Sequence, residues 1–422
     1  NGQIRLNSSD LSSFYFVYQS AGGLSIGKSG SGILANKNDV VDASKDYYME
    51  IFFGDTAIKA KTYNTTEKLT WDTETTISDH IGSTITVNEY AGPAKIKDVS
   101  YRDSTTELLN KVQFNGYFFE NYKGAEKLLR TFSQGASFEF ETNSTTATLD
   151  AVVKTSQIPN IAVSVDGAKP TIIKLTDGST KLFDNLSATN HKVVVWIDGL
   201  YEGDWFWTDP NYGIFIRNIT TPSNTYIRKP SDKRKSILII GDSITEGVNI
   251  HGTDGNPDSN SGYNSYSNFM ARILNMRPLV HGFGGTGLSV GGSGQVPKYL
   301  SSITNYSKDK RVFNETIPDV IVINGGTNDA GNNIPNATFV ADYQALINNQ
   351  RNKYPAAKII LLVPFNGACR LSILALGSSN GLPVIDMSIF SGITTSDGTH
   401  PNLSGHSKLA EQLALLLKPL IQ

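Results

Sequence analysis

Cysteine is almost absent from this sequence, since Cys369 is the only one among 422 residues. A single thiol excludes an intramolecular disulfide framework, and we interpret Cys369 as a small core residue. No apolar run approaches the ~20 residues that a membrane-spanning helix needs, so we expect no membrane span. Charged residues make up 18% of the chain and the formal net charge is −2. We therefore expect neither nucleic acid nor an anionic membrane as a partner.

Uncharged polar residues take the place of the missing charges, and Asn, Ser, Thr and Tyr are abundant. This composition suits a secreted, cell-surface or virion-associated β protein, and we expect such a location. The chain is too long to fold around one ordinary hydrophobic core, so we expect two or three domains. Because the sequence begins at Asn1 and not at methionine, we interpret it as a mature form or a fragment, in which a targeting segment would not be visible.

Residues 1–103 are predicted to form an accessory β-sandwich. Short alternating runs separated by Gly and Asp turns are typical of strands. The runs lie at residues 13–18, 47–53, 57–63 and 94–101. Their order resembles the later strands of a concanavalin-like lectin sandwich. The alternative is a sandwich without a ligand site.

Residues 104–134 are predicted to connect this sandwich to the rest of the chain. Their composition differs from that of the flanking segments, because alternation between polar and apolar residues weakens here. Two stretches, 107–112 and 122–130, have the most helix-like patterns. We therefore expect one or two short helices in the connector.

Residues 135–230 return to the β pattern and are predicted to form a jelly roll. Strand-like runs recur about ten residues apart, and Asp-Gly pairs follow two of them, as in antiparallel sandwiches. The runs lie at residues 137–141, 161–165, 171–175, 191–197 and 213–217. The aromatic segment Tyr201–Trp207 lies between the last two. It forms either a platform for sugar rings or part of the packing in the core or between domains.

Residues 231–422 alternate buried strands with amphipathic helices, after a Pro-containing linker at 219–235. Strands are expected at 237–240, 278–281, 319–324, 358–363 and 383–386, and helices at 265–276, 339–353 and 405–420. The alternation indicates a parallel sheet with helices on both faces. Reactive groups in such sheets lie beyond the carboxyl ends of the strands.

Ser243 lies just beyond the first strand of this sheet. A serine hydroxyl becomes an effective nucleophile only with a base, usually histidine, and with donors for the oxyanion. His400 is the best candidate for the base because it follows the last strand, at the same edge of the sheet. Asp397, three residues earlier, is the candidate for the group that orients the imidazole.

The other histidines near the site receive different interpretations. His251 lies in a polar loop and is a candidate for the substrate rim. His281 ends a strand and is expected to be packed. His406 lies on the last helix and is expected to be structural or exposed.

Two further strand-end loops contain candidate oxyanion donors. Gly284, Gly285 and Gly287 lie in one of them, where glycine lets the backbone approach a ligand closely. We choose Gly285 for its position relative to the strand end. Asn328 in the other loop can donate from its side-chain amide. Together with the N–H of Ser243, these groups would form a three-donor oxyanion hole.

Four sequence blocks carry a resemblance to SGNH/GDSL hydrolases. They are Gly241–Thr245, the loop containing Gly285, Gly326–Asp329 and Asp397–Pro401, in the order found in that family. The four hallmark residues of the family match Ser243, Gly285, Asn328 and His400. The resemblance covers residues 236–422 and implies a three-layer α/β/α sandwich. Residues 135–230 resemble the jelly-roll domain that precedes the catalytic domain in carbohydrate esterase family two.

No metal and no cofactor are expected. Asp242 and Asp329 flank the catalytic positions, but the further ligands that a metal site needs are not apparent. We interpret Asp242 as bracing its turn and Asp329 as holding its loop. The candidates for a substrate rim are Asp242, His251, Tyr263, Thr286 and Asp329. The loops at 248–263 and 284–298 would frame the substrate.

The sequence therefore predicts a serine esterase that removes O-acyl groups, foremost O-acetyl groups, from a carbohydrate or polysaccharide through an acyl-enzyme intermediate. One alternative is a glycan-binding or adhesion protein, as in a phage tail or on a cell surface, with secondary esterase activity. Another is a lipase or thioesterase of the same superfamily. The Gly-, Asn-, Ser- and Asp-rich segments around Ser243 disfavour the latter, because a lipase needs an apolar groove or lid.

Overall fold

The computed structural model describes residues 2–8, 14–20, 23–28, 32–37, 47–53, 57–64, 71–76, 81–89, 104–123, 126–231, 233–305 and 316–421. The chain divides into two compact units. One comprises residues 1–102 and 122–127, and the other comprises residues 103–121 and 128–422. Within the described residues, no helix has both the length and the apolar character needed to span a bilayer.

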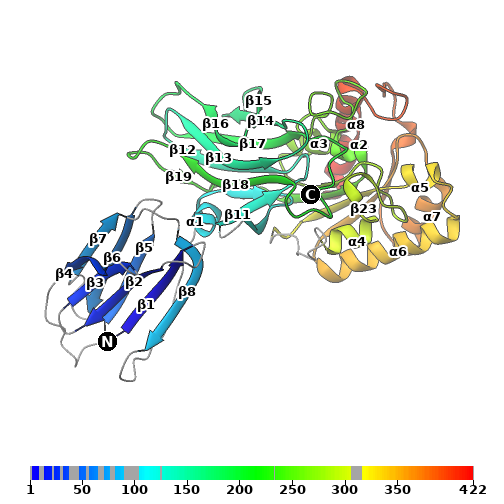
Figure 1. The fold of residues 1–422 in the computed structure, drawn as a ribbon. Helices are drawn as coiled ribbons and strands as arrows, with labels where there is room; N and C mark the ends of the chain where they lie inside the picture. Colours follow the sequence, from blue (N-terminus) through cyan, green and yellow to red (C-terminus); the bar gives the residue numbers. More distant parts are fainter. Residues whose placement is uncertain are drawn as a thin grey trace. The chain divides into compact units, whose positions relative to one another are not determined.

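The first unit contains two antiparallel sheets (Figure 1). One has the order β4-β3-β2-β1-β8 and comprises β1 (Gly2–Ser8), β2 (Phe14–Ser20), β3 (Gly23–Lys28), β4 (Gly32–Lys37) and β8 (Ile81–Glu89). The other comprises β5 (Tyr47–Phe53), β6 (Ala57–Asn64) and β7 (Trp71–Thr76). The runs predicted at 13–18, 47–53 and 57–63 coincide with β2, β5 and β6. The run at 94–101 lies outside the described residues, and the lectin-like character of this unit stays a prediction.

The second unit begins with α1 (Ser104–Lys111) and a series of antiparallel strands (Figure 1). The strands are β9 (Gln113–Asn115), β10 (Phe119–Lys123), β11 (Glu126–Thr131), β12 (Ser137–Thr142), β13 (Ala147–Lys154), β14 (Asn160–Val165), β15 (Thr171–Lys174), β16 (Gly178–Phe183), β17 (His191–Gly199), β18 (Gly213–Thr220) and β19 (Ile227–Arg228). They form two sheets, β10-β11-β18-β13-β16 and β15-β14-β17-β12-β19, with β9 paired to β12. The two sheets share a core that includes Phe138, Leu149, Val193 and Ile216. The strands predicted between 137 and 217 are all present, and the jelly-roll assignment stays a prediction.

The helix predicted at 122–130 is wrong, because the described residues of this stretch lie in β10 and β11. Leu129 of β11 pairs with Ile216 of β18 in an antiparallel register. The adjacent side chains of Leu128 and Leu129 are both fully buried. Neighbouring residues of a strand point to opposite faces, so a strand covered on both sides buries both leucines. The local helical pattern is therefore overridden by pairing with a distant strand.

The C-terminal part is an α/β fold around a parallel sheet of order β21-β20-β22-β23-β24. The strands are β20 (Ser236–Gly241), β21 (Arg277–Gly282), β22 (Val320–Asn324), β23 (Lys358–Val363) and β24 (Val384–Asp386). The helices are α2 (Ser243–Glu246), α3 (Tyr266–Ile273), α4 (Tyr299–Thr304), α5 (Thr327–Gly331), α6 (Asn336–Lys353), α7 (Arg370–Asn380) and α8 (Leu403–Ile421). Short 3₁₀ turns lie at Ser293–Gln295 and Met387–Ile389. The five predicted strands and the three predicted helices are present.

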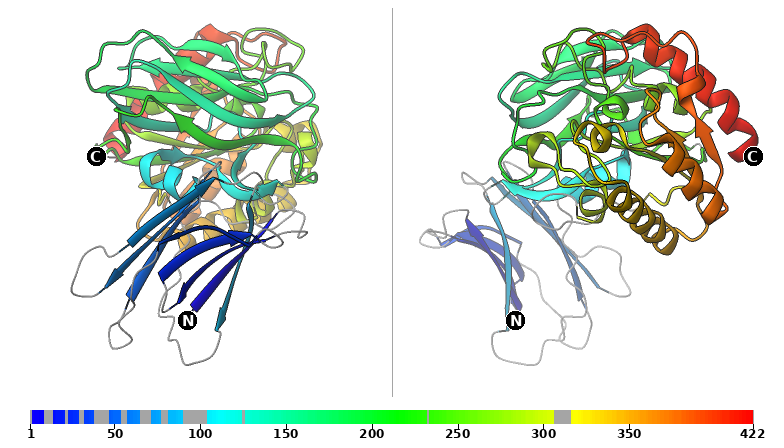
Figure 2. Two further views of the ribbon diagram at one scale, coloured as in Figure 1. Left: turned by 60° about the vertical axis from the view of Figure 1, so that its left-hand side comes forward. Right: turned by 90° about the vertical axis from the view of Figure 1, so that its right-hand side faces the viewer.

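Alternation along β20 places helices on both faces of the sheet. Leu238 and Ile240 pack with the apolar residues of α4, α6 and α7. Ile237 and Ile239 pack with those of α3 and α8. Figures 1 and 2 show α8 in red and α6 in yellow-orange on opposite sides of the sheet. This arrangement confirms the predicted α/β fold for the C-terminal part.

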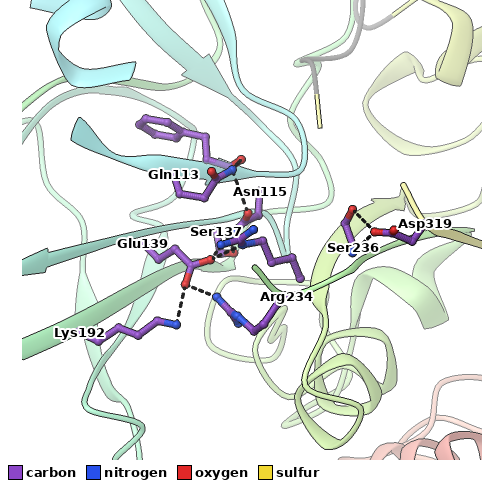
Figure 3. A network of polar contacts seen from close by, with 10 residues as sticks. Gln113, Asn115, Ser137, Glu139, Lys192, Arg234, Ser236 and Asp319 are labelled. Atoms are coloured by element: carbon purple, nitrogen blue, oxygen red, sulfur yellow. Dashed lines mark hydrogen bonds and ion pairs between the residues drawn. The ribbon is translucent and has the colours of Figure 1, made fainter. Parts of the chain in front are cut away.

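The segment predicted as a linker, 219–235, is tied into the second unit by a buried carboxylate. The side chain of Glu139 on β12 is only 1% exposed and binds cations from three parts of the chain. Its partners are Lys192 at 3.3 Å, Arg277 at 3.2 Å and Arg234. Figure 3 shows Glu139 between Lys192 and Arg234. The antiparallel sheets and the parallel sheet therefore belong to one packed body.

Aromatic packing strengthens the same junction. Phe132 and Phe206 of the antiparallel part stack with ring centroids 4.9 Å apart. Both rings, together with Trp207, belong to a core that also contains Leu238 and Phe283 of the α/β part. Such large side chains carry much of the burial energy of a core.

Candidate active site

Ser243 stands at the carboxyl end of β20, as the first residue of the short helix α2. Asp242 caps this helix, because its Oδ1 accepts from the N–H of Ile244 at 3.0 Å. Gly241 lies directly under the turn, where a Cβ atom would stand 1.9 Å from Oγ1 of Thr245. Gly247 ends the helix with a φ of 95°, in the left-handed region that favours glycine. The local sequence thus fixes the position of the Ser243 backbone.

The side chains of Ser243, His400 and Asp397 form a continuous hydrogen-bonded chain. Nε2 of His400 lies 2.8 Å from Oγ of Ser243. Nδ1 of His400 lies 2.7 Å from Oδ2 of Asp397. The three residues come from opposite ends of the domain sequence and meet at one edge of the sheet. Their geometry is that of a nucleophile, a base and a group that fixes the tautomer of the base.

Asp397 is held in its ionised form by several donors. The backbone N–H groups of His400 and Thr399 donate to Oδ1 at 2.7 and 2.9 Å. The side-chain amide of Asn249 donates to Oδ2 at 2.8 Å. Burial by itself would raise the pKa of Asp397. The hydrogen bonds from His400, Asn249 and Thr399 outweigh burial and hold this pKa well below its usual range.

Asn249 is a site residue that the sequence did not single out. Its φ is 57°, in the left-handed region that asparagine tolerates better than most residues. Its N–H donates to Oδ1 of Asn260 at 2.9 Å, and its own Oδ1 accepts from the N–H of Gly255 at 2.9 Å. The side chain is therefore fixed before it reaches Asp397. The loop 248–263 contains several asparagines, so no sequence pattern distinguishes this one.

The loops that contain Gly285 and Asn328 are joined to each other. Gly285 has a φ of 70°, and a Cβ atom there would lie 3.3 Å from Gly292. Nδ2 of Asn328 donates to the carbonyl of Thr286 at 2.8 Å. An amide nitrogen carries two hydrogens, so a second one remains for another acceptor. Asp329 accepts from the N–H groups of Leu288 and Ser289, which holds the glycine-rich loop.

The residues proposed for a substrate rim divide into two groups. Asp242, Thr286 and Asp329 are each only 1% exposed. The prediction that these three residues form the substrate rim is wrong, because side chains this deeply buried hold loops in place inside the fold. His251 is exposed and Tyr263 is half-buried, so both remain accessible. The ring of Tyr263 lies 3.9 Å from the guanidinium carbon of Arg272, and Nε2 of His251 lies 3.3 Å from Nδ2 of Asn264.

His281 and His406 are fully buried. Nε2 of His281 contacts the hydroxyl of Ser302 at 2.9 Å, and Nδ1 of His406 accepts from the N–H of Tyr266 at 3.0 Å. Burial lowers the pKa of each to about 3, so both are neutral at physiological pH. They are structural, and neither bonds to the Ser243 hydroxyl.

The aromatic segment Tyr201–Trp207 packs in part in the core, and its role as a platform for sugar rings stays a prediction. Phe206 and Trp207 are 6% exposed and pack in the core. Trp205 is 62% exposed. Trp207 N–H donates to the carbonyl of Gly294 at 3.2 Å, so the segment lies against the glycine-rich loop at 284–298. In the described part of the chain, no group of three or more His, Cys, Asp or Glu side chains is arranged to hold a metal ion.

Residues 239–408 match the GDSL-like lipase/acylhydrolase family. This part of the chain is similar to GDSL-like acylhydrolases. The predicted resemblance to SGNH/GDSL hydrolases is thereby confirmed. Ser243, Asp397 and His400 all lie inside the matched range, and His400 contacts both of the other two residues.

Two curated proteins are similar to the chain. One is the cellulase/esterase CelE of Acetivibrio thermocellus, 29% identical over 212 residues, which cover 47% of this chain and 25% of that protein. The other is an acetylxylan esterase/glucomannan deacetylase of Cellvibrio japonicus, 21% identical over 62% of this chain and 76% of that protein. The chain thus matches only a quarter of the length of the first relative.

A solved structure shares the fold. It is a family two carbohydrate esterase from Clostridium thermocellum in complex with cellohexaose. The TM-score is 0.60 at 23% identity, and the match covers 74% of this chain and 99% of that one. The shared region is large enough to include both the antiparallel sheets and the GDSL-like domain. The comparison with this structure shows a fold shared with a family two carbohydrate esterase.

Proposed function

We propose that the protein is a serine esterase that removes O-acyl groups, specifically O-acetyl groups, from a carbohydrate. The observation that carries this proposal is the chain of contacts from Ser243 to His400 at 2.8 Å and from His400 to Asp397 at 2.7 Å. A base in contact with a hydroxyl, and a carboxylate in contact with that base, are the parts that acyl transfer requires.

The reaction follows from these positions. Oγ of Ser243 attacks the ester carbonyl while Nε2 of His400 takes its proton. Asp397 holds the imidazole and stabilises the imidazolium. The tetrahedral intermediate then collapses, and His400 returns the proton to the leaving sugar oxygen. Water, deprotonated by His400, attacks the resulting acyl-enzyme and releases acetate.

The oxyanion would be held by the N–H groups of Ser243 and Gly285 and by the amide of Asn328. The hydrogen bond from Asn328 to the carbonyl of Thr286 supports this role, since it orients the amide before substrate binds. Groups fixed in advance stabilise developing charge without reorganisation, which is the main source of rate in such sites.

A carbohydrate substrate is supported by the relatives and by the surroundings of the site. One similar protein is named a cellulase/esterase, and the other is named an acetylxylan esterase/glucomannan deacetylase. Trp205, 62% exposed, stands next to two residues packed against the glycine-rich loop. An exposed aromatic face suits the apolar face of a sugar ring. We further propose that the protein acts outside the cell, on a polymeric glycan.

A decisive test measures acetate release from a panel of acetylated plant, capsular and cell-wall glycans, with Ser243→Ala as the control. Release by the wild type and its loss in the variant are expected. A parallel series of aryl esters from acetyl to octanoyl separates this proposal from a lipase or thioesterase. A preference for long acyl chains would overturn it.

The glycan-binding alternative is tested on the same panel. If the wild type retains glycans in a binding assay but releases no acetate, the protein is an adhesion module and not an esterase. The intact chain is used, so that any contribution of the first unit is included.

A further inference from the structure

Asn260 is a buried polar residue of the loop 248–263, and its side chain is fully engaged in hydrogen bonds. It is only 1% exposed. Its Nδ2 donates to the carbonyl of Leu200 at 2.8 Å and to that of Gly255 at 3.1 Å. Its Oδ1 accepts from the N–H of Asn249 at 2.9 Å. Both amide hydrogens and the amide oxygen therefore have partners, which fixes the orientation of this side chain.

Asn260, Gly255 and Asn249 form a closed ring of hydrogen bonds. The N–H of Gly255 donates to Oδ1 of Asn249, and the carbonyl of Gly255 accepts from Asn260. Asn260 in turn accepts from the N–H of Asn249. The ring thus holds both the backbone and the side-chain oxygen of Asn249. Its remaining polar group, Nδ2, donates to Asp397, so the ring ends at the carboxylate that contacts His400.

This ring is attached to the antiparallel part of the fold at the end of β17. Leu200, whose carbonyl accepts from Asn260, directly follows that strand. Two residues later, the N–H of Glu202 donates to the carbonyl of Gly255 at 3.1 Å. At Gly199 a Cβ atom would stand 2.0 Å from the carbonyl oxygen of Pro257, so the end of the strand packs directly on the loop.

A second attachment holds the residues that follow Asn260. Asp198 on β17 is 3% exposed, and its Oδ1 accepts from the hydroxyl of Ser261 at 2.7 Å and from the N–H of Tyr263 at 2.8 Å. The backbone carbonyl of Asp198 accepts from the N–H of Gly262. The end of β17 therefore fixes the loop 248–263 at the ring and again immediately after it.

Loss of the Asn260 side chain would release the position of Asn249. The N–H of Asn249 would lose its acceptor, and the left-handed backbone at φ 57° costs free energy that the ring now offsets. The amide of Asn249 would then move relative to Asp397. Misplacing a catalytic group by about 1 Å can cost on the order of 10²-fold in rate. A small shift of the loop is therefore sufficient to lower turnover.

We propose that Asn260 is a positioning residue, which ties Asn249 to the end of β17 and thereby fixes Asp397. Asp397 in turn holds the imidazole of His400. Asn260 acts through these residues and does not touch the substrate. The antiparallel part of the fold is thus a support for the base as well as a candidate platform for glycan. The proposal rests on the esterase function proposed above.

The first test measures kcat and KM of Asn260→Ala on an aryl acetate, at a temperature well below the melting temperature of the variant. We expect kcat to fall ~10- to 100-fold with KM within about twofold, because misplaced groups cost turnover and not binding. Asn249→Ala/Asn260→Ala is expected to have the same kcat as Asn249→Ala, since residues that act through one another are not additive. Unchanged kcat in Asn260→Ala, or effects that multiply in the double variant, would overturn the proposal.

Asn260→Asp tests the tie to β17 by itself. The protonated carboxyl group still donates one hydrogen to the carbonyl of Leu200 and accepts from the N–H of Asn249, whereas the ionised group has no hydrogen to donate. The ratio of wild-type to variant kcat is therefore expected to rise between pH 5 and pH 9. A ratio that stays at one throughout would overturn the proposal. If Asn260→Ala does not fold, this ratio decides alone.

Asn115→Ala is the matched control, because Asn115 is an equally buried asparagine of the antiparallel part, 2% exposed. Its Nδ2 donates to Glu139 at 3.2 Å and to Ser137 at 3.4 Å, away from the loop 248–263. This variant is expected to melt at a lower temperature than the wild type and to keep its kcat. An equal fall of kcat in Asn115→Ala and Asn260→Ala would show that lost stability, and not positioning, lowers turnover.

Proton NMR decides the question without any esterase activity. The proton between Nδ1 of His400 and Oδ2 of Asp397, which are 2.7 Å apart, gives a signal far downfield of the other amide protons. This signal is expected in Ser243→Ala and is expected to shift or disappear in Ser243→Ala/Asn260→Ala. An unchanged signal would refute the positioning role. An inactive wild type together with a changed signal would refute only the esterase function.

Discussion

Nδ2 of Asn249 donates to Oδ2 of Asp397 at 2.8 Å, and the same oxygen contacts Nδ1 of His400 at 2.7 Å. A single carboxylate oxygen is thus held between an amide and the imidazole. Asn249 therefore orients the group that orients the base. The backbone of Asn249 lies in the left-handed region. The conformation of the loop therefore helps to bring the side chain of Asn249 to Asp397.

Asn249→Ala is expected to lower kcat by about 10- to 100-fold with little change in KM, because Asp397 loses a donor and the imidazole becomes misplaced. Steady-state kinetics on an aryl acetate measure the effect. Asn348→Ala, a change of the same kind on the exposed side of α6, serves as the control and should leave kcat unchanged. Equal kcat in both variants would contradict the role of Asn249.

Asp397→Asn is expected to lower kcat by ~10³–10⁴, because the amide fixes the wrong imidazole tautomer. It should also alter stability in a pH-dependent way. The pKa of Asp397 is lowered on folding, so its contribution to stability is present above the ordinary pKa of about 3.9 and is lost as pH falls below it. The difference in melting temperature between the wild type and this variant should therefore shrink between pH 6 and pH 3. A constant difference would show that the carboxylate is not stabilised by folding.

Asn328→Asp keeps the shape of the side chain but removes both N–H hydrogens. We expect kcat to fall by ~10²–10³, the usual cost of one oxyanion donor. Loss of the hydrogen bond to the carbonyl of Thr286 should add a small destabilisation of about 1 kcal/mol. A circular dichroism melt checks the second effect. Unchanged kcat together with a lower melting temperature would leave Asn328 with a structural role only.

Trp205→Ala is expected to raise KM for an acetylated oligosaccharide without changing kinetics on an aryl acetate. The ring is 62% exposed, so the substitution should change stability very little. Trp207→Ala is the contrasting variant, because its buried ring should cost about 3–5 kcal/mol of unfolding free energy. Equal KM values for the oligosaccharide in wild type and Trp205→Ala would exclude Trp205 from substrate binding.

Glu139→Gln is expected to lower the unfolding free energy by about 3–5 kcal/mol, because it neutralises a buried carboxylate that binds three cations. The buried carboxylate binds Lys192, Arg234 and Arg277, which come from both parts of the second unit. Urea denaturation followed by tryptophan fluorescence measures the change. Glu141→Gln, next to it but more exposed and paired with Arg228, is the control and should cost about 1 kcal/mol or less.

The strands and helices of the C-terminal part could be predicted because their patterns are local. Apolar runs such as that of β20, bounded by Gly241, have the periodicity of a buried parallel strand, and α6 and α8 bury one face each. The helices α2, α4, α5 and α7 were not predicted. The strand β11 was mistaken for a helix, because its conformation is decided by pairing with β18, more than eighty residues later.

The nucleophile, the base and its partner could be proposed from sequence because each follows a strand end, and strand ends of a parallel sheet meet at one edge. Asn249 could not. Its side chain acts through contacts between loops, and loop contacts depend on three-dimensional proximity that no periodicity encodes. The burial of Asp242, Thr286 and Asp329 was missed for the same reason.

The sequence by itself determined the five strands and the helices α3, α6 and α8 of residues 231–422, and the chemical identities of Ser243, Asp397 and His400. These depend on apolar periodicity and on residue type, which are properties of the chain. Only the tertiary structure decided that Asn249 reaches Asp397. It also decided that Phe206 and Trp207 are buried whereas Trp205 is exposed. Packing of separate segments into one body creates these contacts, because hydrogen bonding and burial are decided by neighbours in space and not by neighbours in sequence.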